Sequence, residues 1–154
     1  MSLTDSYSQT SSLTYDDNGN FSGEIPVLLN GTIKITKEGY KNKLINVSSG
    51  NADLDLGIAN IDQITYNIAF NGNNPEPDTA ILSGSTASMT NVGYFTSTQL
   101  NANGFAIKDK INGEVCESFE GWAITEEGEK VYDDKGFVES LTSTDGDTVT
   151  LYGK

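Results

Sequence analysis

Residues 64–70 read Ile-Thr-Tyr-Asn-Ile-Ala-Phe, and this stretch decides the fold class. Large apolar side chains stand at every second position, and threonine, asparagine and alanine fill the positions between them. An alternation with a period of two residues is typical of a β-strand that buries one face in a core. The sequence therefore predicts a strand over residues 64–70.

Further short strands are predicted on both sides of this stretch. They cover residues 21–29 (with Pro26 at an edge or bulge), 32–36, 43–47, 89–96, 116–124 and 148–152. Asn-Gly, Glu-Gly and Asp-Gly pairs at residues 30–31, 38–39 and 145–146 indicate tight turns. Such turn signals recur about every ten residues, which favours a mainly β fold or a strand-dominated α+β fold.

Two segments are ambiguous. Residues 51–64 fit both a strand and a helical face, and Gly57 favours the strand because glycine costs a helix about 1 kcal/mol relative to alanine. Residues 99–110 read as irregular structure or as one helical turn. Residues 71–78 form a predicted loop, since Pro75 and Pro77 exclude regular structure.

The composition excludes several classes of function. The 154 residues include 22 Asp and Glu against 9 Lys, with no Arg and no His, so the net charge is −13. A surface this acidic repels phosphate, so we expect no nucleic-acid partner and no attraction to anionic membranes. Without histidine there is no imidazole base, no Ser-His-Asp triad and no His-ligated zinc. We expect no cofactor, no metal centre and no insertion into a membrane.

The single cysteine cannot form an internal disulfide. Cys116 is predicted to be a small buried hydrophobe or a free thiol, and no cation lies near it in sequence, so a catalytic role is not expected. The chain begins Met1-Ser2-Leu3, which resembles a vector remnant ahead of an excised fragment. The missing signal peptide therefore says nothing about localisation.

Several motifs follow one another in the second half of the chain. In order they are residues 66–73 (Tyr-Asn-Ile-Ala-Phe-Asn-Gly-Asn), 119–124 (Phe-Glu-Gly-Trp-Ala-Ile), 131–134 (Val-Tyr-Asp-Asp) and 146–152 (Gly-Asp-Thr-Val-Thr-Leu-Tyr). This order resembles the Listeria–Bacteroides repeat, the internalin B-type B repeat. The positions that carry the resemblance are Phe70, Gly72, Phe119, Gly121, Trp122, Tyr132, Leu151 and Tyr152. The chain departs from the family in two places: residues 112–118 lack its Gly-Tyr pair, and its final Trp is missing.

The resemblance implies a domain division and a setting. Residues 64–154 would form one repeat with a small β-grasp-like (ubiquitin-like) fold, after a β-rich and possibly incomplete N-terminal module at residues 1–63. Members of this family are extracellular, and their repeats usually serve as spacers or interaction modules of bacterial surface proteins. We therefore expect a non-enzymatic, cell-surface segment with a protein or glycan partner. The alternative is a carbohydrate-binding module of a secreted protein.

Each candidate site has a structural interpretation beside the functional one. Trp122 is a core anchor or a platform on which a sugar stacks, and a row of exposed rings among Tyr40, Tyr66, Tyr94 and Trp122 would favour sugar binding. A carboxylate pair could hydrolyse glycosides or form an acidic face. The candidates are Glu114, Glu117, Glu120, Asp133 and Asp134. The acidic loops at residues 16–20 and 145–147 are turns or weak calcium sites, since they lack the full ligand spacing of an EF-hand.

Overall fold

The protein is described by a computed structural model that covers residues 2–5, 10–12, 14–16, 20–23, 30–48 and 55–154. The described residues form strands, turns and loops and contain no helix, so the fold is mainly β as predicted. No described segment is a helix long and apolar enough to cross a membrane. The chain divides into two compact units, Met1–Asp62 and Gln63–Lys154. The division lies one residue from the boundary expected from the sequence.

The first unit contains a four-stranded antiparallel sheet with the order β2-β1-β5-β6. The strands are β1 (Ser2–Asp5), β2 (Thr10–Ser12), β5 (Asn30–Ile35) and β6 (Lys43–Ser48). A separate pair joins β3 (Thr14–Tyr15) to β4 (Phe21–Ser22). A small core of Ile33, Ile35 and Val47 lies on β5 and β6. The strands predicted over residues 32–36 and 43–47 are therefore confirmed, and they pair with each other.

Two predictions in the first unit are wrong. Asn30 and Gly31 do not form a turn: both belong to β5 and pair with Ser48 and Val47 of β6. The Asn30 amide oxygen accepts a hydrogen bond from the Ser48 hydroxyl at 2.8 Å, which ties this pair across the two strands. Residues 55–62 contain no strand and instead pass over the small core with partly buried apolar side chains. The strand predicted over residues 21–29 is present at Phe21–Ser22 as β4, and its residues 24–29 lie outside the described residues, as do residues 51–54 of the ambiguous segment.

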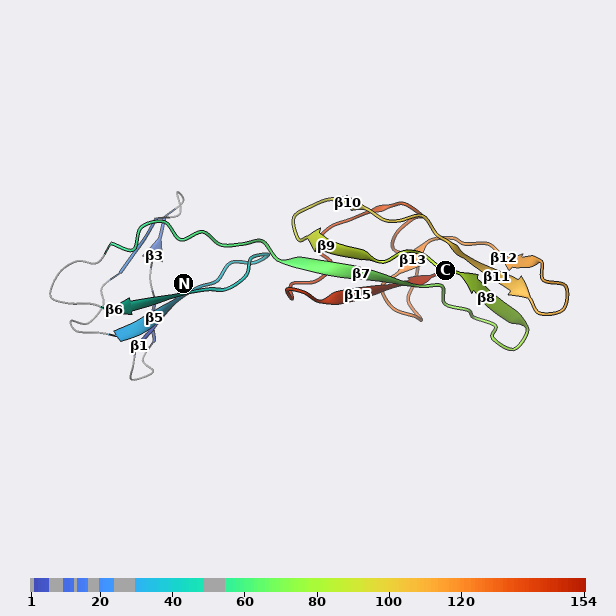
Figure 1. The fold of residues 1–154 in the computed structure, drawn as a ribbon, viewed down its shortest axis with the longest axis horizontal. Helices are drawn as coiled ribbons and strands as arrows, with labels where there is room; N and C mark the ends of the chain where they lie inside the picture. The colour runs from blue at the N-terminus through green and yellow to red at the C-terminus, as the bar shows by residue number, and fades with distance from the viewer. Residues whose placement is uncertain (1, 6–9, 13, 17–19, 24–29, 49–54) are drawn as a thin grey trace. The chain divides into compact units, whose positions relative to one another are not determined.

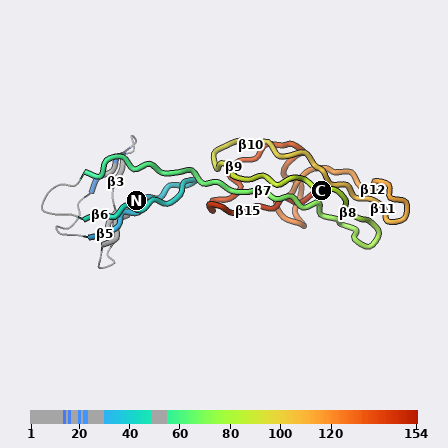
Figure 2. The backbone as a smooth tube through the Cα atoms, in the orientation of Figure 1, coloured from blue at the N-terminus to red at the C-terminus, as the bar shows by residue number. Residues whose placement is uncertain are grey.

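The second unit is built around a mixed sheet with the order β13-β15-β7-β9 (Figure 1). Its strands are β7 (Thr65–Asn71), β9 (Met89–Gly93), β13 (Trp122–Ala123) and β15 (Thr148–Gly153). The two middle strands, β7 and β15, are parallel, and both outer strands are antiparallel to their neighbours. The unit's first and last strands are thus central neighbours, as the tube also shows (Figure 2).

Two smaller sheets complete the second unit. One has the order β12-β11-β8, formed by β8 (Ala80–Gly84), β11 (Phe105–Asp109) and β12 (Val115–Glu117). The other pairs β10 (Thr98–Gln99) with β14 (Phe137–Val138). Residues 99–110 are therefore not irregular, because β11 runs through them. A β-grasp-like fold stays a prediction, since the described part of this unit has the parallel central pair but no helix.

The core of the second unit is on the mixed sheet. The predicted strand at residues 64–70 is confirmed, and its side chains Tyr66 and Ile68 are fully buried. Leu151 from β15 and Trp122 from β13 are also fully buried in the same cluster. The alternation in residues 64–70 therefore reported a real division between a core face and an outer face.

Candidate functional site

The residues that carry the family resemblance gather mainly around Trp122. The Trp122 ring lies 4.7 Å from the ring of Phe70 and 4.8 Å from the ring of Phe119, measured between centroids. Both contacts are tilted or edge-on, which is a favourable arrangement for aromatic rings. The Trp122 side chain has no exposed surface. It is a core anchor and not a sugar platform.

The backbone around Trp122 explains the glycine before it. Trp122 and Tyr132 exchange hydrogen bonds: the Trp122 N–H donates to the Tyr132 carbonyl at 2.7 Å, and the Tyr132 N–H donates to the Trp122 carbonyl at 3.0 Å. Gly121 adopts φ 149°, and a Cβ atom there would collide with the Tyr132 carbonyl oxygen. Only a residue without a Cβ atom allows the Tyr132 carbonyl to approach the backbone this closely.

The strand predicted over residues 116–124 is wrong in its middle. It is divided into β12 and β13, and the two are separated by residues 118–121. The positive φ of Gly121 ends the alternation of faces, so Phe119 and Trp122 contact each other when strict alternation would have separated them. Cys116 is exposed on β12, not buried as a small hydrophobe, and its thiol lies 3.5 Å from the Ile107 carbonyl oxygen.

Gly72, Leu151 and Tyr152 hold the remaining motif positions. A Cβ atom at Gly72 would come within 2.5 Å of Leu82 Cδ1 and 2.7 Å of Phe105 Cδ1, so the chain passes under these side chains. Leu151 lies opposite Phe70, and Tyr152 lies opposite Asn71 on β7 and Ala123 on β13. These positions build the sheet and its core.

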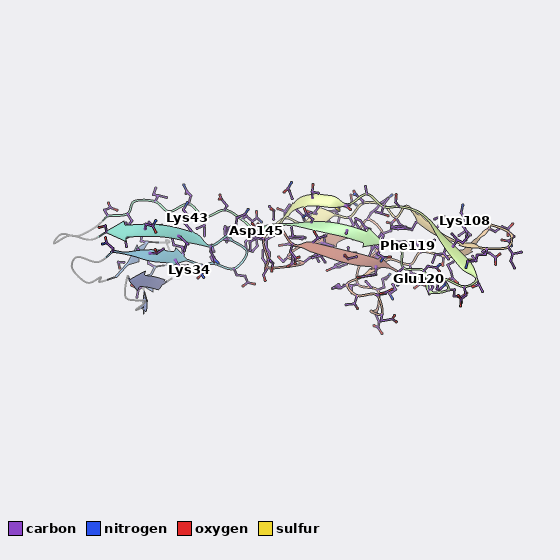
Figure 3. All side chains as sticks on the ribbon, turned by 60° about the horizontal axis from the view of Figure 1, so that its bottom comes forward. Lys34, Lys43, Lys108, Phe119, Glu120 and Asp145 are labelled. Atoms are coloured by element: carbon purple, nitrogen blue, oxygen red, sulfur yellow. The ribbon has the colours of Figure 1, made fainter. Side chains whose placement is uncertain are left out.

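A hollow of about 290 Å³ opens at the end of β7 and β15 and is the candidate ligand site among the residues that the structure describes. Phe105, Ile107 and Phe119 contribute apolar surface, and Glu117 and Glu120 contribute carboxylates. Phe119 and Glu120 lie next to the ends of these two strands in the side-chain view (Figure 3). Both glutamates are exposed. The hollow therefore combines aromatic surface with negative charge.

The side chains of Asn73 and Lys154, which also line the hollow, make hydrogen bonds that stabilise the fold. The Lys154 ammonium donates to the Glu126 carbonyl at 2.6 Å, and the Asn73 amide nitrogen donates to the same oxygen at 3.1 Å. The Asn73 amide also reaches the Gly153 carbonyl at 3.3 Å. The two carboxylates are thus the charged groups of the hollow that remain directed to solvent.

The carboxylates named as candidate catalytic groups do not form a buried acid–base pair. Glu114, Glu117, Glu120, Asp133 and Asp134 are all exposed. The Lys130 ammonium donates to Asp133 at 2.8 Å, which lowers the pKa of Asp133 and raises the pKa of Lys130. Asp134 accepts from the backbone N–H of Asn103 at 2.7 Å. A glycosidase acid normally sits where burial raises its pKa, and these surroundings do not resemble that.

In both acidic loops, described aspartates accept hydrogen bonds from the chain itself. The two carboxylate oxygens of Asp16 accept from the Asn20 backbone and side chain, each at 2.9 Å, whereas residues 17–19 lie outside the described residues. Asp145 accepts from the Thr65 N–H at 3.2 Å, and Asp147 accepts from the Thr142 hydroxyl at 3.0 Å. The described part of the chain contains no group of three or more His, Cys, Asp or Glu placed to hold a metal ion.

Sequence reasoning missed Phe105 as part of the hollow. Phe105 and Ile107 alternate with Ala106 and Lys108, so a period of two was present in a segment interpreted as irregular. Comparisons of the chain with protein-family models, with curated proteins and with solved structures found no match.

Proposed function

We propose that this chain is a non-enzymatic segment of a bacterial cell-surface protein that acts as a spacer or as a protein-interaction and adhesion module. The observation that carries the proposal is the burial of its large rings. Tyr66 and Trp122 have no exposed surface, and Tyr94 is 8% exposed. Three of the four rings that could have formed a sugar platform are core residues.

The packing of the motif residues supports a repeat-like second unit. Phe70, Phe119, Tyr132 and Leu151 all belong to the cluster around Trp122. The parallel pairing of β7 with β15 is compatible with a β-grasp-like sheet. On the resemblance, we infer an extracellular repeat that follows a separate β-rich module.

A glycan array with the full chain tests the non-enzymatic spacer proposal against its alternative. We expect no glycan to bind above background and no sugar to be released from a panel of polysaccharides. Saturable binding of one glycan class would overturn the spacer interpretation, and release of reducing sugar would overturn the non-enzymatic one.

Localisation is tested on cells of the source organism. An antibody raised against the chain should label intact cells, and brief treatment of those cells with a protease should remove the label. Labelling that requires permeabilised cells would contradict the cell-surface proposal.

A carbohydrate-binding module remains the second candidate, because the hollow offers Phe105 and Phe119 beside two carboxylates. Aromatic surface next to hydrogen-bond acceptors suits a sugar ring. If a glycan binds, Phe119→Ala should abolish binding, and the control Phe137→Ala should not. Phe137 is exposed on β14 and does not line the hollow. Equal binding by both variants would exclude the hollow as the sugar site.

A further inference from the structure

The two ends of the second unit attach to neighbouring strands. The unit begins at Gln63, two residues before β7, and β15 ends one residue before Lys154. Tension along the backbone therefore enters the unit at the start of β7 and leaves it at the end of β15. We propose that this unit is a load-bearing element, in which the parallel seam between β7 and β15 carries tension as shear.

The direction of the two strands decides how the load is shared. Thr148 lies opposite Asn67, and Tyr152 lies opposite Asn71, so both strands run the same way (Figure 1). The two points of attachment are consequently at opposite ends of the seam. Pulling them apart slides one strand along the other and loads all the interstrand hydrogen bonds together. In an antiparallel pair pulled from adjacent ends, the bonds would break one after another.

Hydrogen bonds outside the ladder lengthen the seam at both ends. At its start, the Gly146 N–H donates to the Thr65 carbonyl and the Asn67 N–H donates to the Asp147 carbonyl, each at 2.8 Å. At its end, the Asn73 side chain donates to the Gly153 carbonyl at 3.3 Å. The bonded region thus runs from Thr65 to Asn73 along one side.

The seam is covered by the core of the unit. Ile68 on β7 and Leu151 on β15 are fully buried, and Trp122 packs in the same cluster. Sliding the strands past each other would expose this surface at the same moment as the hydrogen bonds break. The loss of the hydrogen bonds and the exposure of the apolar core must therefore be overcome in the same step, which makes forced unfolding slow.

The load-bearing inference rests on the proposed spacer role, and it concerns the second unit alone. A spacer on a cell surface transmits pulling forces between a partner and the cell. A parallel seam between its first and last strands gives it resistance along that direction only. Resistance should therefore depend on where the unit is held, and this dependence can be measured without changing the fold.

Single-molecule force spectroscopy on the full chain tests the inference in two pulling geometries. In the first, the handles are attached to the two chain termini of the Cys116→Ser variant. Unfolding of the second unit is recognised by its length gain, about 330 Å less the folded span for residues 63–154 at about 3.6 Å each. In the second, the handles are attached to the exposed thiol of Cys116 and to the C-terminus.

The second geometry unzips the same unit. The chain from Cys116 leads into β13, where Trp122 lies opposite Gly153 in an antiparallel pair, so both handles pull at one end of β15. We expect an unfolding force about twofold or more higher between the termini than between Cys116 and the C-terminus at the same loading rate. A smaller ratio would overturn the load-bearing inference. It would leave the spacer proposal to be decided by glycan binding and surface labelling.

Discussion

Trp122 and Tyr132 are joined by two backbone hydrogen bonds, of 2.7 and 3.0 Å, and the carbonyl oxygen of Tyr132 faces the Cα atom of Gly121. This isolated bridge fixes the segment that inserts the indole ring into the core. The glycine of the Phe-Glu-Gly-Trp motif is therefore a packing requirement of the fold.

Gly121→Ala should destabilise the second unit by about 2 kcal/mol or more. The new methyl group would collide with the Tyr132 carbonyl oxygen and lie 2.6 Å from Lys130 Cδ. Urea unfolding followed by the fluorescence of the single tryptophan measures the change, because Trp122 belongs to this unit.

Gly113→Ala is the matched control for this substitution. Gly113 has φ 72°, and a Cβ atom there would meet no described heavy atom within 4 Å. The free energy of unfolding of the Gly113→Ala variant should fall by only about 1 kcal/mol, which is the cost of placing alanine in a left-handed backbone conformation. Equal losses in the two variants would show that the contact with Tyr132 does not matter.

Leu151→Ala should destabilise the second unit by about 3 kcal/mol. The Leu151 side chain is fully buried between β7 and the Trp122 cluster, so its removal leaves a cavity. Val131→Ala is the control, since Val131 is 54% exposed and should change stability by no more than about 0.5 kcal/mol. Urea unfolding followed by tryptophan fluorescence measures the stability of both variants. A loss below that of the control would place Leu151 outside the core.

Tyr66 should make the protein sensitive to alkaline pH. Its hydroxyl is buried without a well-formed hydrogen bond to any described residue. Burial raises the pKa of Tyr66 above its usual 10.0, while the backbone of Leu141 opposes the shift. The neutral Tyr66 hydroxyl therefore contributes its full stabilisation of the folded state below pH 10, the pKa of tyrosine in the unfolded chain. That contribution is lost as pH rises through the higher pKa of Tyr66 in the folded state. The reason is that the unfolded chain releases the proton first.

Tyr66→Phe isolates this contribution. At pH 7 the variant should match the parent within about 1 kcal/mol, because the hydroxyl it loses makes little net contribution. As pH rises above about 10 the parent should lose more stability than the variant, because the two proteins differ only in the Tyr66 hydroxyl. Parallel pH profiles for the two proteins would show that Tyr66 ionises as it does in the unfolded chain.

Local alternation in the sequence was enough to predict the strands of the mixed sheet that carry it. Residues 64–70 have a period of two and form a strand that buries Tyr66 and Ile68, and the strand predicted over residues 148–152 is present as β15. Their parallel pairing could not be predicted, because it joins segments about 80 residues apart and depends on the whole core. The turn predicted at Asn30-Gly31 was wrong for a related reason: both residues pair with β6, and Gly31 pairs with β1 as well, which holds them in an extended strand.

The candidate hollow was only partly predictable. Glu117 and Glu120 were named as carboxylates, but nothing local places Phe105 beside Phe119, since the two come from separate segments. The apparent strand also hid the break at residues 118–121, where Gly121 has a positive φ and Phe119 contacts Trp122. Long-range packing and one backbone angle decided this part of the molecule.

Cys116 should react with a thiol reagent in the native protein. Of the two alternatives for Cys116, its exposure on β12 contradicts the buried hydrophobe and supports the free thiol, and Val115 and Glu117 beside it are exposed as well. With Ellman's reagent, we expect one thiol per chain to react in buffer at nearly the rate seen in urea. Cys116→Ser should give no signal and should unfold at the same urea concentration as the parent, because the side chain fills no core space. If the parent thiol reacted only after unfolding, β12 would be covered in solution, and the second pulling geometry would need another attachment point.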